Sequence, residues 1–136
     1  MDDLQYTDHG LLSAHYFFPS DALVPSSVVH GSTEATRNSS KGRVFVIGEF
    51  DLDEQQGVPL QEPFNAAVAA LLSGIRAIAL DRDDLAEAKG SLYFDLALVP
   101  DSGHAGLFLG TAELAELASA GANLLVSAWP GTAWSR

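Results

Sequence analysis

The sequence predicts one α+β domain, with a largely antiparallel sheet of about five strands and two main helices packed on one face. Several segments alternate apolar and polar residues with a period of two, as half-buried strands do. Two other segments repeat apolar residues every three to four positions, as amphipathic helices do. A chain of 136 residues also fits a single domain with its own core.

Five segments are predicted as strands by this alternation. They span residues 12–18, 43–52, 91–99, 107–109 and 124–129. In the second strand, the residues expected to face the core are Val44, Val46, Phe50 and Leu52, and those expected to face away are Phe45, Ile47, Glu49 and Asp51. Because the third and fourth strands are close in sequence, we expect them to pair as an antiparallel hairpin.

Two main helices are predicted, over residues 62–80 and 111–121, with Thr111 as the N-cap of the second. A short helix is expected after Pro25, so the order is β-α-β-α-β-β-α-β. Residues 31–42 are rich in Ser, Thr, Asn and Gly and are predicted as a surface loop. The acidic run 81–84 should end the long helix, because carboxylates at a helix C-terminus oppose its dipole.

The whole chain, residues 1–136, is expected to form this one domain, with residues 1–10 loosely ordered and residues 130–136 as a C-terminal tail. The N-terminus lacks the basic and apolar regions of a secretory signal, and there are no cysteines, which is compatible with the cytoplasm. The longest uncharged apolar stretch, residues 63–75, is shorter than the roughly 20 residues of a membrane-spanning helix. We therefore do not expect a membrane protein.

The formal net charge is −11, from seven Lys and Arg against eighteen Asp and Glu. Proteins that bind nucleic acid neutralise its phosphates with basic clusters, and this chain has none, so we expect no nucleic-acid partner. The acidic surplus has two interpretations, simple solubility or attraction to a basic protein partner.

One group of side chains stands out as a candidate site. If the helices cover the face of the sheet that bears Leu12 and Phe94, the opposite face collects the polar residues of the strands. These are Ser13, His15, Glu49, Asp51, Tyr93, Asp95, Ser127 and Trp129. An imidazole, several carboxylates and amphipathic aromatic rings suit a binding surface or an acid–base site. The alternative is a sheet face that is polar only because water touches it.

A second acidic group and a partial calcium pattern are further candidate sites in the sequence. Asp81, Asp83 and Asp84 form a charge run that either ends the helix or serves a partner. A calcium-loop register starts at Asp51, but Gln56 stands where that loop needs glycine. No nucleophile motif or phosphate-binding loop is present in the sequence. We therefore expect no metal, no cofactor and no catalytic residues.

Short motifs along the chain carry a family resemblance. They are residues 24–31, Thr36 with the pair Lys41-Gly42, Leu71-Leu72, and the closing stretches 106–109 and 114–122. From about Leu12 to Trp129 the chain resembles the bacterial domain-of-unknown-function family 4279. It differs in the second strand, where the family often has a tryptophan and this chain has residues 47–50, Ile-Gly-Glu-Phe. The resemblance implies no catalytic residues, and some members of the family resemble immunity proteins that neutralise secreted toxins.

These observations favour a non-enzymatic, protein-binding cytoplasmic domain, with an immunity-type role against a basic, toxin-like protein as its sharpest form. The alternative is a small enzyme or ligand-binding protein that uses the polar sheet face around His15, Glu49 and Asp95. A third option is a homo-oligomer formed through a sheet edge or through Trp129 and Trp134. A concave pocket would favour the enzyme, whereas a broad exposed patch would favour protein binding.

Overall fold

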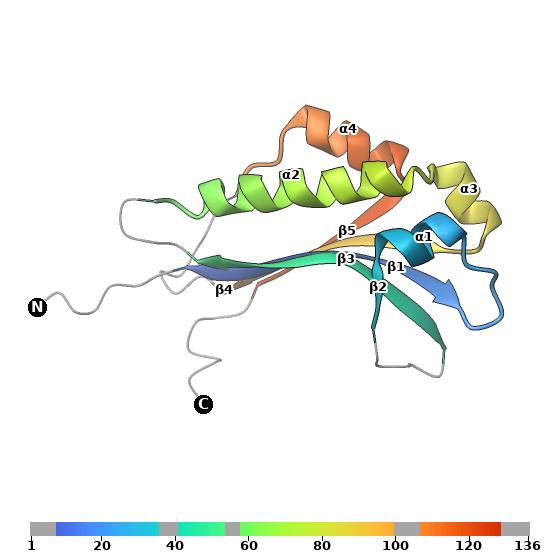
Figure 1. Ribbon diagram of the computed structural model, residues 1–136. Coiled ribbons are helices and arrows are strands. Elements are labelled where there is room, and N and C mark those ends of the chain that lie inside the picture. Colours follow the sequence, from blue (N-terminus) through green and yellow to red (C-terminus); the bar gives the residue numbers. More distant parts are fainter. Residues whose placement is uncertain (1–7, 36–40, 54–57, 100–106, 129–136) are drawn as a thin grey trace, which may run out of the picture.

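The computed structural model describes residues 8–35, 41–53, 58–99 and 107–128, and everything below concerns these residues. In chain order the elements are β1 (His9–Pro19), α1 (Ser26–Gly31), β2 (Thr33–Glu34), β3 (Gly42–Asp53), α2 (Gln61–Ile78), α3 (Arg82–Glu87), β4 (Ser91–Val99), α4 (Thr111–Ser119) and β5 (Ala122–Ala128). The helices lie over one face of the sheet, and none of the described helices covers the other face (Figure 1). We call this uncovered side the open face.

The sheet is mixed, with the strand order β2-β3-β1-β4-β5. The pairs β2–β3, β3–β1 and β1–β4 are antiparallel, whereas β4 and β5 are parallel. The α+β class is therefore confirmed, and the sheet is largely antiparallel as predicted, with one parallel pair, β4–β5, that the prediction did not include. Helix α4 connects β4 to β5, because parallel neighbours require a crossover between them.

The predicted strand 107–109 is wrong, and with it the predicted hairpin. These residues form no regular secondary structure and pair with no strand in the described part of the chain. Instead, the Gln61 side chain accepts the Phe108 N–H at 2.7 Å and donates to the Phe108 carbonyl at 2.8 Å. One side-chain amide thus satisfies both backbone groups of Phe108, while Leu107 and Leu109 pack against the core. The apolar pattern of residues 107–109, which predicted a strand, therefore comes from core packing and from the contact with Gln61, and no pairing with a described strand is involved.

The core lies between the sheet and α2. On β1, Leu12, Ala14, Tyr16 and Phe18 are each fully buried, as the alternation predicts. The apolar stripe of α2 covers them with Phe64, Val68, Leu71, Leu72, Ile75 and Ile78. The predicted long helix is confirmed, with bounds shifted by one residue at its start and two at its end.

A β-bulge in β3 overturns the predicted faces of Val44, Phe45 and Val46, whereas the predicted faces of residues 49–52 are confirmed. Ala14 is opposite Gly48, but His15 is opposite Val46, so Ile47 is an extra residue on β3. An extra residue reverses the alternation on one side of it. Phe45 is therefore buried in the core at 1% exposure, while Val44 and Val46 belong to the open face.

The acidic run 81–84 begins a helix and does not terminate α2 by opposing its dipole. Helix α2 ends at Ile78 through Ala79, which adopts a left-handed conformation with φ of 56°. Asp81 is the N-cap of α3, and its carboxylate accepts the Asp84 N–H at 2.8 Å. Asp83 and Asp84 stand in the first turn of α3, where a negative charge favours the helix dipole.

Four smaller predictions concern the other element ends. The short helix after Pro25 is confirmed as α1. Within the predicted loop 31–42, residues 33–34 form β2, and residues 36–40 lie outside the described residues. Thr111 is the first residue of α4 and not its cap, because Gly110 occupies the N-cap position. Strand β1 starts at His9, inside the segment 1–10 expected to be loosely ordered.

The burial of Phe94 and Leu71 leads to a stability prediction. Each is 1% exposed, on β4 and α2 respectively. We expect Phe94→Ala and Leu71→Ala each to lower the free energy of unfolding by about 2–5 kcal/mol, because each leaves a cavity in the core. Urea titration measures the change. The control Leu23→Ala, at a side chain that is 91% exposed, should stay within about 0.5 kcal/mol of the parent chain. A core variant that matches this control would contradict the core assignment.

Tyr16 gives a second stability prediction. Its hydroxyl is buried without a hydrogen-bond partner among the described residues, and burial raises the pKa of Tyr16 to about 12. A buried polar group without a partner keeps its desolvation cost. We therefore expect Tyr16→Phe to leave the free energy of unfolding unchanged or to raise it by about 1 kcal/mol. If urea titration instead shows that Tyr16→Phe lowers the free energy of unfolding by about 1 kcal/mol, the hydroxyl has a hydrogen-bond partner.

Candidate functional interface on the open face of the sheet

The open face brings together most of the polar residues singled out from the sequence. β1 is the central strand, and Ser13 lies opposite Glu49 on β3 and Asp95 on β4. His15, the next residue on this side of β1, lies opposite Tyr93. The structure thus places side chains from three separate parts of the chain next to one another, because β3 and β4 flank β1.

His15 is held by its neighbours at the middle of this face. Its ring stacks on that of Tyr93, with centroids 5.3 Å apart and planes inclined by 28°. Burial lowers the pKa of His15 from its ordinary value of 6.5, and the charges of Asp95 and Glu49 oppose this shift. At neutral pH the ring is therefore mainly uncharged, so it contributes an aromatic surface and a hydrogen-bonding group rather than a positive charge.

Four carboxylates make the open face acidic. Glu49, Asp51 and Asp53 follow one another at alternate positions of β3, and Asp95 lies on β4. The Asp53 carboxylate contacts the His9 ring at 2.8 Å. No Lys or Arg of the described strands points to this side, since Arg43, the one basic residue in them, pairs with Phe18 on the helical side.

Apolar side chains beside His15 belong to the same face, and sequence reasoning assigned two of them to the core. Val46 lies opposite His15, and Val44 lies opposite Phe17. All three of these apolar side chains are half-buried, so the open face offers apolar area as well as charge. The signal that could have found Val44 and Val46 is the glycine at position 48, because glycine within a strand often marks a bulge.

The remaining predicted site residues are not part of this cluster. Asp81, Asp83 and Asp84 belong to α3, which lies on the helical side (Figure 1). The charge of Asp81, ahead of smaller effects, raises the pKa of Asp84, and the Asp81 carboxylate is engaged as a helix cap. Trp129 lies outside the described residues.

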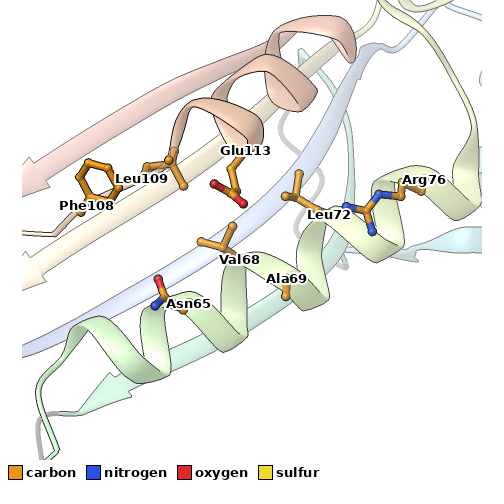
Figure 2. A pocket seen from close by; sticks show the side chains of 9 residues that line it. Asn65, Val68, Ala69, Leu72, Arg76, Phe108, Leu109 and Glu113 are labelled. Atoms are coloured by element: carbon orange, nitrogen blue, oxygen red, sulfur yellow. The ribbon is translucent and has the colours of Figure 1, made fainter.

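In the described part of the chain, one hollow of about 330 Å³ lies beside α3 and the starts of β4 and β5. Two more lie beside α2 on the helical side of the sheet. The first of these two, of about 380 Å³, is bordered by α2, by the segment before α4 and by α4 itself. Figure 2 shows Asn65, Val68 and Leu72 on α2 facing Phe108, Leu109 and Glu113 across it. At one end Arg76 is held by a two-pronged ion pair with Glu116 of α4.

The second hollow, of about 340 Å³, is lined only by apolar residues of β1, α2, β4, the segment 107–109 and β5. It contains no titratable side chain, so it cannot perform acid–base chemistry by itself. Neither hollow includes His15, Glu49 or Asp95 in its lining.

The described residues contain no group of three or more His, Asp or Glu side chains placed to hold a metal ion. Asp51 and Asp53 of the partial calcium pattern lie on strand β3, whereas positions 54–57 fall outside the described residues. Within the described part of the chain, no helix is both long and apolar enough to cross a membrane.

Comparison with protein-family models, with curated proteins and with solved structures finds no match to this chain.

The shifted His15 predicts how stability depends on pH. Because the pKa of His15 is lowered in the folded chain, the unfolded chain binds the proton more readily. The stabilising effect is therefore complete above the unfolded pKa of about 6.5 and is lost as the pH falls from there through the folded pKa. We expect His15→Gln to reduce the loss of melting temperature between about pH 7.5 and about pH 5.5. An NMR titration should place the His15 midpoint below the ordinary value of 6.5, and a higher midpoint would contradict the burial of the ring.

Proposed function

We propose that this chain is a protein-binding domain that recognises a basic protein through the open face of its sheet. The observation that carries the proposal is the charge on this face. Four carboxylates gather on β3 and β4, and the described strands place no Lys or Arg beside them. Charged surfaces of one sign steer a partner of the opposite sign and select against partners of the same sign.

The mixture of chemistry on the open face supports a protein as the partner. A binding surface needs apolar area that can be desolvated as well as charges at its rim. The half-buried Phe17, Val44 and Val46 provide the apolar area next to the stacked rings of His15 and Tyr93. Aromatic rings held by stacking lose little conformational freedom on binding and are frequent at the centres of interfaces.

The immunity-type role is the most specific form of the proposal. It rests on the resemblance to family 4279, and membership of that family is part of what we propose. Toxins that act on nucleic acid carry basic surfaces, since they must neutralise phosphates. An acidic face that covers such a surface would compete directly with the nucleic acid.

The test compares two triple variants that change the formal charge equally. Glu49→Gln, Asp51→Asn and Asp95→Asn together neutralise the open face. The control combines Glu62→Gln, Asp83→Asn and Glu87→Gln, three exposed carboxylates of α2 and α3 on the helical side. The immobilised chain first captures protein from its own cells, and the captured protein is then purified for binding kinetics.

We expect the open-face triple to slow association roughly tenfold or more, because steering charges act mainly on the association rate. The control triple should slow it much less, and rising salt should weaken binding of the parent chain. Equal effects of both triples would show that net charge alone is recognised. A small molecule that stabilises the parent chain but not His15→Gln, with no protein captured, would favour the ligand-binding alternative.

A further inference from the structure

The two edges of the sheet are built differently. The β3 edge is partly covered by β2, which has only two residues, and Glu34 of β2 is held by Arg43 through two hydrogen bonds of 2.8 and 2.9 Å. Beyond β2, the β3 edge carries the bulge at Ile47 and the carboxylates of Glu49, Asp51 and Asp53. Short strands, bulges and charges are the features that prevent an edge from pairing with another chain.

The β5 edge has none of these protections. Its seven residues, Ala-Asn-Leu-Leu-Val-Ser-Ala, include no charge, no proline and no glycine. β5 pairs only with β4 among the described residues, so none of the described strands pairs with its outer row of backbone N–H and C=O groups. Leu124, Leu125 and Val126 are 49%, 46% and 60% exposed. An open, uncharged and apolar edge is a template for pairing with another strand.

Both faces of β5 present apolar side chains to an added strand. Leu125 lies opposite Asp95 and so points to the open face, whereas Leu124 and Val126 lie opposite Phe94 and Leu96 on the helical side. Leu124 and Val126 also border the apolar hollow of about 340 Å³. Space for an incoming apolar side chain therefore lies directly beside the open edge.

We infer that β5 is the surface through which two copies of this chain associate, edge to edge and antiparallel, about a two-fold axis. The partner strand that we expect at this edge is β5 of a second copy, because an uncharged apolar strand is complementary to itself. In this arrangement Leu124 of each copy comes near Val126 of the other on the helical side. The edges left over are two β3 edges, which are protected, so the assembly closes as a dimer and does not grow into a filament.

The area of the β5–β5 contact indicates how tightly the two copies should associate. One strand pair with three apolar side chains per copy covers less than the ~1,600 Å² of a standard interface. We therefore expect a monomer–dimer equilibrium that shifts between micromolar and millimolar protein. Because each copy carries a net charge of −11, salt should strengthen the dimer by screening repulsion. This response is opposite to that of a basic partner, so the two proposals fail independently.

Sedimentation of the full chain tests the inference. We expect the mass to rise with concentration for the parent chain. Leu125→Lys should remain monomeric because two lysines would meet at the two-fold axis, and Val126→Lys because each lysine would lie against Leu124 of the other copy. The control Leu23→Lys adds the same charge at a more exposed leucine away from the sheet, and it should dimerise as the parent chain does. Melting temperatures confirm that each variant folds.

Hydrogen exchange locates the contact. Amide protection of β5 should increase with protein concentration, while that of Thr33 and Glu34 at the opposite edge should not. A parent chain that stays monomeric at millimolar concentration and high salt would overturn the inference. So would a dimer that Leu125→Lys and Val126→Lys leave intact, or one that Leu23→Lys also abolishes.

Discussion

The central position of β1 is the constraint on which both faces of this molecule depend. β1 has strands on both sides, and its side chains alternate strictly. The even-numbered residues from Leu12 to Phe18 are fully buried and found the core. The odd-numbered residues Ser13 and His15 stand at the centre of the open face, between the carboxylates of β3 and β4. One strand with a period of two therefore positions the core and the candidate interface at once.

The bulge in β3 allows Phe45 to face the core and Glu49 to face the open face, which strict alternation along the strand would not permit. Toward the start of β3 the core needs Phe45, which packs edge to face on Phe18 with centroids 6.0 Å apart. Toward its end the open face carries Glu49, an even number of residues from Phe45 and yet on the other side of the sheet. The extra residue Ile47 makes both possible. Gly74 of α2 faces it, where an added Cβ would lie 2.5 Å from an Ile47 methyl carbon, so the bulge also fixes how closely α2 approaches.

Features that depend on residues within one element could be predicted from the sequence, whereas features that depend on distant residues could not. The faces of β1 and β4 and the stripe of α2 depend on periodicity within one element, and they are confirmed. The failures depend on partners distant in the chain. Phe45 needs the register against β1, Phe108 needs the amide of Gln61, and Asp81 needs the unexpected start of α3. The open-face residues could be named, but their contact required the strand order.

The charge of this chain and the proposed edge-to-edge dimer are compatible because the charge is unevenly placed. The carboxylates of β3 lie at one side of the sheet and the neutral β5 at the other. In an edge-to-edge dimer the two β3 strands would be seven strand spacings apart, about 34 Å at about 4.8 Å each. That distance is several times the screening length of about 8 Å at physiological salt, so the two acidic rows would scarcely repel each other there. At low salt the screening length rises to about 30 Å, and the repulsion that added salt removes is then felt. In the edge-to-edge dimer both open faces lie on the same side of the joined sheet. Each open face could therefore engage a basic partner while the β5 contact stays intact.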